Sequence, residues 1–313
     1  MCGHTALPHV ICHEIAGASA DELRVWLLGH GALVEGTLGA GGAILIRGAD
    51  IGSPDAFRTV CTALTPELRS YAGGGSPRTH VGGGIYTSTE YAARASIPLH
   101  IEASYLPRMP SRVWFYCETP PEEGGETPLG DMSLIAARLD PVHLERWRSA
   151  GVLYVTNLHG GQGFGRSWMD TYETSDRAVV EHHLAAHGAS FRWKADGGLR
   201  VELRAPATRR HPRTGQEVWV NQAINWHPYH LGAQSFAALE QAFGDIGNFP
   251  KSAFFGDGTP ISREQFAEIA QALDTVETTF EWQADDILLV DNERVAHGRR
   301  PYRGARSIYV ALS

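Results

Sequence analysis

Residues 285–313 read DDILLVDNERVAHGRRPYRGARSIYVALS and contain two apolar runs, ILLV and SIYVAL, on either side of a polar stretch. Short β-branched runs bounded by turn residues are typical of buried strands. Further strand-like runs cover residues 98–105, 112–119, 193–205 and 217–224, and helical patterns cover 134–150, 175–186 and 262–273. Many short strands with scattered helices predict an all-β core with helical additions (α+β), arranged as a jelly roll.

The first ninety residues predict a helix at 19–30, a strand at 43–48 and a second helix at 54–64. Residues 71–94 are rich in glycine, serine and threonine, which favours a flexible loop beside the active site over packed structure. This segment lacks the lysine and the strand–loop–helix context of a phosphate-binding loop. No repeat or linker divides the chain, so a single domain over residues 1–313 is expected.

Composition narrows the class of partner. The net charge of -8 argues against a surface for nucleic acid or anionic lipid, so a small-molecule substrate is expected. The chain shows neither a signal-peptide pattern nor a run of about 18 apolar residues, and its four cysteines lack metal or disulfide spacing, which together favour the cytoplasm. Cys2 could accept a lipid, but no apolar segment accompanies it. The oligomeric state is left open by the sequence.

A candidate metal site starts from His100 and Glu102. Residues two apart in a strand point to the same face, so both side chains can reach one ion, although such a pair arises easily among 15 histidines. His297 follows an apolar strand and precedes four arginines, and it supplies a third ligand. Two histidines and a carboxylate leave positions open for a bidentate oxoacid and O2 on iron. His183 and His187 have no acidic or cysteine companion and are assigned to a surface helix.

Five motifs extend the argument to a family: IPLHIEASY, PEEGGETPLGD, EVWVNQAINWH, FFGDGTPI and VDNERVAHGRRPYRGARSIYVAL. In this order they resemble the taurine dioxygenase-like superfamily, and within it the SyrP-like amino-acid hydroxylases of peptide-antibiotic pathways. The resemblance implies a cupin-like double-stranded β-helix that binds Fe(II) through His100, Glu102 and His297 and uses 2-oxoglutarate and O2 as co-substrates. A glutamate at position 102 is usual in the clavaminate synthase-like branch, and its presence argues against halogenation.

The same resemblance assigns the co-substrate contacts. Thr127 and Arg306 match the residues that hold the 2-oxoglutarate carboxylate, with Arg303 as a second candidate for the arginine. An arginine suits this role because its fixed fork of donors matches a carboxylate. Thr127 could instead be a turn residue bonded to local backbone.

Candidate substrate contacts are Ser104, Tyr105, Asn221, Arg299 and Arg300. Ser104 shares the strand face of the ligands by parity, Asn221 could equally be a core residue, and the two arginines could simply be solvated.

The resemblance implies hydroxylation of a C–H bond in an amino acid or amino-acid derivative, either free or held by a peptidyl carrier protein. Desaturation or epoxidation by the same cofactor stays open. A catalytically inactive jelly-roll binding protein and a zinc hydrolase are the alternatives from other classes.

Overall fold

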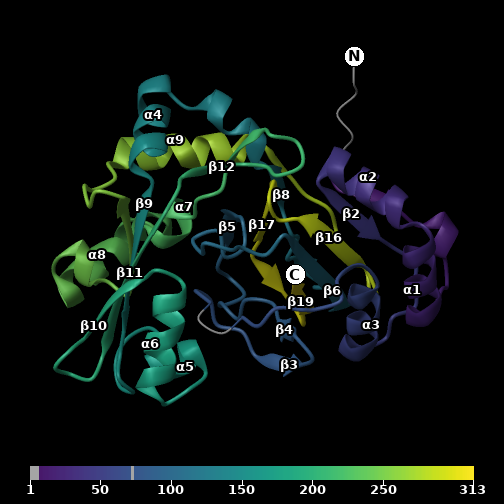
Figure 1. Cartoon of the computed structure of the whole chain (residues 1–313), viewed down its shortest axis with the longest axis horizontal. Coiled ribbons are helices and arrows are strands. Elements are labelled where there is room, and N and C mark those ends of the chain that lie inside the picture. The colour runs from purple at the N-terminus through teal and green to yellow at the C-terminus, as the bar shows by residue number, and fades with distance from the viewer. Residues whose placement is uncertain (1–6, 72–73) are drawn as a thin grey trace.

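The computed structural model describes residues 7–71 and 74–313, so Cys2 lies outside the described residues. Its largest sheet has seven strands (Figure 1). In spatial order these are β1 (His9–Ile11), β2 (Ala43–Ile46), β16 (Ile287–Asp291), β6 (Arg112–Thr119), β19 (Ser307–Leu312), β4 (Ile85–Thr87) and β3 (His80–Gly82). The three central strands pair antiparallel, with β6 between β16 and β19.

A four-stranded sheet contains the strands that carry the histidines of the predicted metal site. Its order is β15 (Glu277–Thr278), β8 (Leu129–Asp131), β17 (Val295–Arg299) and β5 (Ile97–His100). Leu129 and Val295 of this sheet share one buried cluster with Phe115, Leu288 and Val310 of the seven-stranded sheet. The two sheets therefore enclose an apolar core between them, as a jelly roll requires.

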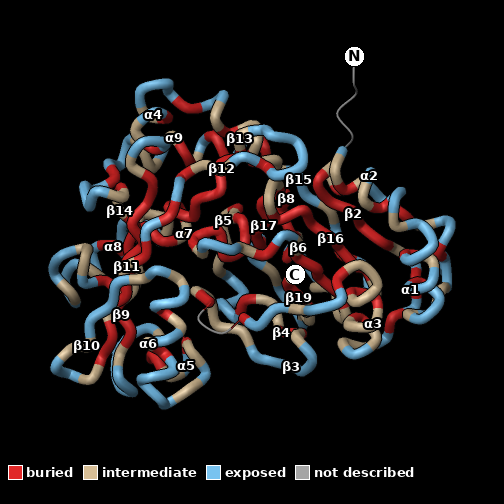
Figure 2. The backbone as a smooth tube through the Cα atoms, in the orientation of Figure 1, coloured by how far each residue is buried: buried red, intermediate tan, exposed pale blue. Residues whose placement is uncertain are grey.

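The opposite face of the seven-stranded sheet is also buried. Alternate residues such as Trp114, Tyr116 and Leu289 pack against helices on that side, whereas their neighbours point into the core between the sheets. The covering helices are α1 (Ala20–Gly29), α2 (Gly31–Gly41) and α3 (Pro54–Leu64). Burial on both faces explains the continuous apolar runs in the sequence, and Figure 2 shows the red buried strand β2 beside the paler helices α1 and α2.

A third sheet lies beside the jelly roll and is built largely from segments that the sequence patterns did not identify. Its order is β10 (Ser190–Trp193), β11 (Leu199–Ala205), β9 (Val152–Leu158) and β14 (Lys251–Phe255). Two small ribbons pair β12 (Thr208–Arg210) with β13 (Glu217–Trp219) and β7 (Glu123–Gly124) with β18 (Tyr302–Arg303). The helices around these strands are α4 (Pro141–Ala150), α5 (Trp168–Tyr172), α6 (Arg177–Ala186), α7 (Ala223–Trp226), α8 (Ala233–Phe243) and α9 (Arg263–Asp274).

Several local predictions differ from the structure, among them the strand at 217–224, which stops at Trp219 before helix α7 begins. In the described part of the segment 71–94, strands β3 and β4 form a hairpin and β4 pairs with β19, whereas the flexibility of the segment stays a prediction. The predicted strand 98–105 stops at His100, and the following residues form turns in which Ala103 has a φ of 51°. Among the described residues, no helix is long and apolar enough to cross a membrane.

Candidate functional site

The two histidines of the predicted site face each other across neighbouring strands. His297 on β17 is the direct antiparallel partner of His100 on β5, and their ring centroids lie 4.6 Å apart. Side chains of directly opposed residues project on the same side of a sheet. Strand pairing therefore brings together two imidazoles that are nearly 200 residues apart in sequence.

Glu102 reaches the same point by a different route from the predicted one. It lies in the turn after β5, so strand parity does not orient it. Its backbone is held by Asn292, whose Oδ1 accepts from Glu102 N at 2.8 Å and whose Nδ2 donates to Glu102 O at 3.0 Å. Asn292 is fully buried in the connection between β16 and β17, and that connection leads directly to His297.

These three side chains can hold a metal ion. One ligand atom from each lies within 4.8 Å of the others, and His297 Nε2 is 3.8 Å from Glu102 Oε2. His100 Nδ1 lies 2.9 Å from the Pro98 carbonyl oxygen, which places the proton on Nδ1 and leaves Nε2 for a metal. Two imidazole nitrogens and one carboxylate oxygen are the donor set of non-haem Fe(II) oxygenases.

The protonation states suit this role. Burial, followed by the neighbouring His297, lowers the pKa of His100 to about 4, so its imidazole is neutral at neutral pH. Burial raises the pKa of Glu102, but the charge of Arg78 and the contacts of His297 and His100 bring that pKa below its usual value. A neutral imidazole and an ionised carboxylate are the forms that bind metal.

Arg78 is a site residue that the sequence patterns did not identify. Its Nη2 forms an ion pair with Glu102 Oε2, and both side chains are almost completely buried. The guanidinium also lies 4.2 Å from the ring centroid of Tyr71, while its Nε and Nη1 have no hydrogen-bond partner among the described residues. An arginine in a glycine-rich segment carries no sequence pattern that marks it as a site residue. Its contact with Glu102 depends on how the chain folds around the start of β3.

A second group of possible metal ligands comprises His211, Asp291 and Glu293. Asp291 Oδ2 already accepts from Arg213 at 2.5 Å and lies 3.1 Å from His211 Nε2. We therefore assign this group to a structural ion-pair network.

A small cavity lies on one side of the histidines, with a volume of about 30 Å³. Among the residues that line it are Arg78, His100, Thr127, His297, Arg299 and Arg306. Thr127 is buried and its hydroxyl accepts from the Trp282 indole at 3.1 Å. Burial, and then the charge of Arg299, lowers the pKa of Arg306 to about 10. Arg303, by contrast, is 79% exposed and pairs with Glu123 at 2.9 Å.

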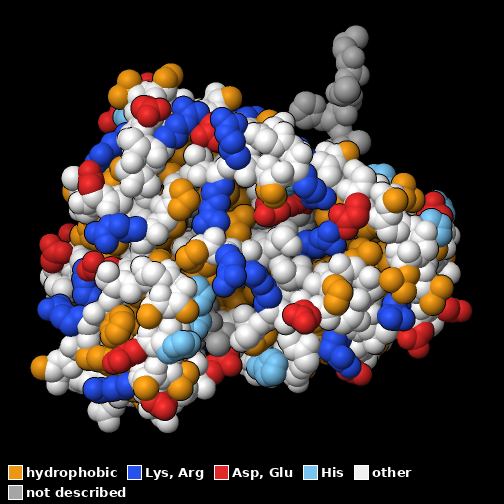
Figure 3. Space-filling view, in the orientation of Figure 1, with side chains coloured by type: hydrophobic (Ala, Val, Ile, Leu, Met, Phe, Trp, Pro, Cys, Tyr) orange, Lys and Arg blue, Asp and Glu red, His pale blue; other side chains and the backbone are white. Residues whose placement is uncertain are grey.

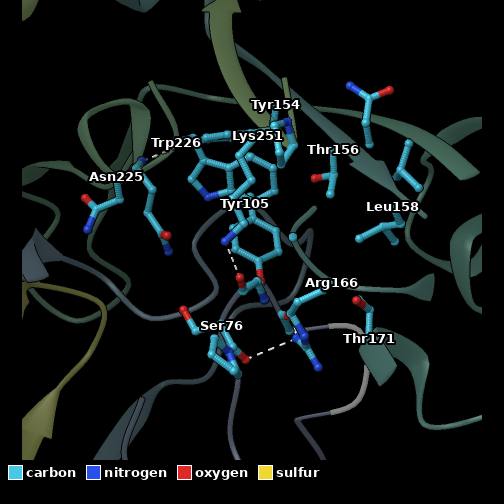
Figure 4. A pocket seen from close by; sticks show the side chains of 18 of the residues that line it. Ser76, Tyr105, Tyr154, Thr156, Leu158, Arg166, Thr171, Asn225, Trp226 and Lys251 are labelled. Carbon is cyan, nitrogen blue, oxygen red and sulfur yellow. Dashed lines mark hydrogen bonds between the residues drawn. The ribbon is translucent and has the colours of Figure 1, made fainter. Parts of the chain in front are cut away.

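A larger pocket, shown in Figure 4, has a volume of about 1110 Å³. His100 and Glu102 belong to its wall, and His100 also lines the small cavity. Of the five predicted substrate contacts, Tyr105 lines the large pocket. The wall also contains Arg166, Trp226 and Lys251, two of which, Arg166 and Lys251, were not singled out from the sequence. His183 and His187, which the sequence placed on a surface helix, also line it.

The other four predicted contacts lie off the wall of the large pocket. Ser104 is buried in the turn, where the backbone leaves the strand geometry on which its predicted position depended. The Asn221 amide bonds to the backbone at Ala207 and Ala223. Arg299 donates to the backbone carbonyl oxygens of Thr89, Tyr91, Ala92 and Ala95. Arg300 pairs with Glu277 on β15.

Comparisons with known proteins agree with this architecture. Residues 6–312 match the family model described as taurine catabolism dioxygenase TauD, TfdA family. The chain is 32% identical over 309 residues to the dapdiamide synthesis protein DdaC of Enterobacter agglomerans, covering 97% of this chain and 91% of that protein. It is 31% identical over 280 residues to a clavaminate synthase-like protein of Arabidopsis thaliana, covering 87% and 81% of the two chains.

Solved structures show the same fold. PvcB, an Fe, α-ketoglutarate dependent oxygenase from an isonitrile synthetic pathway, superimposes with a TM-score of 0.52 at 16% identity, over 97% of this chain and 84% of that one. A putative α-ketoglutarate dependent 2,4-D dioxygenase from Burkholderia xenovorans gives 0.50 at 15% identity, over 99% and 95%. These neighbours confirm the predicted jelly-roll core.

The protein is therefore an Fe(II)- and 2-oxoglutarate-dependent dioxygenase. It belongs to the TauD/TfdA family, as the sequence motifs predicted. Iron is the cofactor, and 2-oxoglutarate and O2 are the co-substrates. The inactive binding protein and the zinc hydrolase are consequently not favoured.

Asn292→Ala should weaken metal binding, because it releases the backbone that positions Glu102. Loss of a residue that orients a metal ligand typically costs about 10- to 100-fold in affinity. Titration with Co(II) under anaerobic conditions measures this effect. Asn248→Ala removes an exposed amide and serves as the control. Unchanged Co(II) affinity in folded Asn292→Ala would show that the amide does not position the ligand.

Arg78→Met should destabilise the metal-free protein by about 3 kcal/mol, because it leaves the Glu102 carboxylate buried without its counter-charge. Added Mn(II) supplies that charge, so the metal-induced rise in melting temperature should be larger in Arg78→Met than in the wild type. Arg58→Met, which alters a partly exposed ion pair with Asp55, is the control. Equal metal-induced rises in all three proteins would contradict a neutralising role for Arg78.

Proposed function

We propose that the enzyme hydroxylates an unactivated C–H bond of an amino acid or amino-acid derivative. The observation that carries this proposal is that His100 lines both cavities. One proposed ligand of the metal site thus contributes to the walls of both a small basic cavity and a large, mainly apolar and aromatic pocket. This arrangement suits an iron that must meet a charged co-substrate and an organic substrate together.

The small cavity is the proposed place of the 2-oxoglutarate carboxylate. Thr127 and Arg306 line it, whereas Arg303 lies outside and already has an acidic partner. A volume of about 30 Å³ has room for only one or two water molecules, so a wall side chain must move to admit the co-substrate. We expect Arg78 to be that side chain, since a metal ion would replace it as the positive partner of Glu102.

The bound iron and co-substrates supply the oxidising chemistry: 2-oxoglutarate and O2 yield succinate and CO2, and one oxygen atom enters the substrate C–H bond. The protein holds the metal with His100, Glu102 and His297 and positions the C–H bond near it. Aromatic side chains of the large pocket, including Tyr105 and Trp226, exclude water from that position. Retention of Glu102 as a protein ligand favours hydroxylation over halogenation.

The size of the pocket and the names of the similar proteins support a natural-product substrate. A volume of about 1110 Å³ exceeds the usual range for sites that bind drug-sized ligands, so an amino-acid derivative, or one tethered to a peptidyl carrier protein, suits it better than a free amino acid. DdaC is named for dapdiamide synthesis and PvcB comes from an isonitrile pathway. Desaturation and epoxidation are the alternative outcomes. We place the reaction in the cytoplasm, where the free thiols of Cys61 and Cys117 would stay reduced.

Glu102→Ala and His297→Ala should each abolish iron-dependent succinate release, because each removes one of three protein ligands. The visible absorption band that forms when 2-oxoglutarate binds Fe(II) should disappear in both variants. His182→Ala removes an exposed histidine and should leave the band and the turnover unchanged. Normal succinate release by either ligand variant would refute the assignment of the metal site.

Arg306→Ala should weaken 2-oxoglutarate binding by about 3–5 kcal/mol, since it removes one side of a buried charge pair. Arg303→Ala is the matched control and should have little effect, because its side chain is exposed. Titration of the Fe(II)–2-oxoglutarate absorption band gives both affinities. If Arg303→Ala proves to be the weaker binder, the carboxylate partner has been assigned to the wrong arginine.

A further inference from the structure

The wall of the large pocket is positively charged, in contrast to the protein as a whole. The chain carries a net charge of -8, and acidic and basic side chains are both spread over the face in Figure 3. Among the described residues, the pocket wall contains Arg166 and Lys251 but a single carboxylate, Glu102. That carboxylate belongs to the metal site and is already paired with Arg78. The rest of the wall therefore offers no acidic partner to a ligand.

Lys251 is one of only two lysines in the chain, the other being Lys194. It lies at the start of β14, half-buried, with Nζ 5.2 Å from the ring centroid of Trp226. Its ammonium group donates to the carbonyl oxygen of Gly75, and no carboxylate among the described residues pairs with it. Figure 4 shows Lys251 beside Trp226 and Tyr105 in the pocket wall.

Arg166 is held in a similar way on the same wall. Its Nη1 donates to the carbonyl oxygens of Gly74 and Ser76, each at 3.2 Å, and its Nη2 donates to that of Asp170 at 2.7 Å. No acidic side chain of the described residues lies within ion-pair distance of it. Lys251 and Arg166 thus both donate to backbone carbonyl oxygens of residues 74–76. Among the described residues, only neutral dipoles compensate these two positive charges.

The field of Lys251 extends to its neighbours in the pocket. The positive charge of Lys251 is the main reason that the pKa of Tyr91, another residue of the wall, falls below its usual value. A half-buried cation without a counter-ion is only partly compensated by carbonyl dipoles, and an anion that reaches it forms a strong charge-assisted hydrogen bond. An ammonium group at the same place would be repelled and would find no carboxylate.

From these charges we infer that the substrate carries a free carboxylate bound by Lys251 and Arg166, and that its amino group is acylated. This inference rests on the proposed function, because it refines the amino-acid derivative to an N-acylated, anionic one. The carboxylate lies at the Lys251 wall of the pocket, and the remaining apolar body of the substrate fills the space toward Glu102 and His100. A zwitterionic free amino acid is disfavoured by the same charges.

The first test compares two dyes with the same aromatic body, the anionic 8-anilinonaphthalene-1-sulfonate and the neutral N-phenyl-1-naphthylamine. The full chain is loaded anaerobically with Fe(II) and 2-oxoglutarate, and dye fluorescence is titrated. Lys251→Gln should lower the affinity for the anionic dye by about 10- to 100-fold and leave the affinity for the neutral dye unchanged, because a charged hydrogen bond is lost. Arg166→Gln should act in the same direction.

Two further variants separate charge from structure. Lys251→Arg keeps the positive charge and should keep the affinity for the anionic dye, whereas Lys194→Gln removes the other lysine, which lies off the pocket wall, and should change nothing. Glutamine at position 251 keeps a neutral N–H donor, so this variant removes the positive charge and not the capacity to donate a hydrogen bond. Equal affinity of the wild type and Lys251→Gln for the anionic dye would overturn the inference.

Displacement of the bound dye addresses the substrate class. N-acetyl-L-leucine should displace it at roughly one-tenth of the concentration needed for N-acetyl-L-leucinamide or L-leucine. Displacement by the amide or by the free amino acid at the same concentration as the acid would overturn the inference. Failure of the proposed function would appear separately, as absence of any hydroxylated product from amino-acid derivatives in a wild type that still binds the anionic dye in a Lys251-dependent way.

Discussion

The side-chain amide of Asn292 is the contact on which the metal site depends. It bonds to both the N–H and the carbonyl of Glu102 and also donates to the carbonyl of Pro110 at 2.7 Å. The same connection between strands delivers His297 five residues later, opposite His100. One short segment thus fixes Glu102 relative to the two histidines. Strand pairing positions His100 and His297, whereas no strand orients Glu102.

The balance of charge around this contact explains the neighbouring structure. A buried carboxylate requires a cation, and Arg78, two residues before β3, provides it. Arg299 fixes the segment after the hairpin of β3 and β4 through four backbone carbonyl oxygens, from Thr89 to Ala95. Two arginines therefore hold the glycine-rich segment against the site, Arg78 through Glu102 and Arg299 through the backbone. Residues of this segment line both cavities.

The jelly roll supplies the ligands, whereas the additions supply the pocket. Strands β9 and β14 and helices α6, α7 and α8 contribute much of the large pocket wall, including Lys251. This division suits a family in which a constant reaction is applied to different substrates, because loops and inserted elements can change without disturbing the core. In this chain the inserted elements bring two cations and aromatic rings to the substrate side.

The sequence alone predicted the three candidate metal ligands and determined the family, the strand-rich core and helix α3, because these depend on local periodicity and on motifs with fixed residues. It predicted a strand through residue 105, which stops at His100, and a flexible loop at 71–94, in which β3 and β4 form a hairpin because β4 pairs with the distant strand β19. Only the tertiary structure placed Arg306 in the wall of the small cavity and Arg303 outside it, and revealed Arg78 and Lys251. The role of a cation depends on which buried partner or cavity it faces, and that is fixed by contacts between segments far apart in the chain.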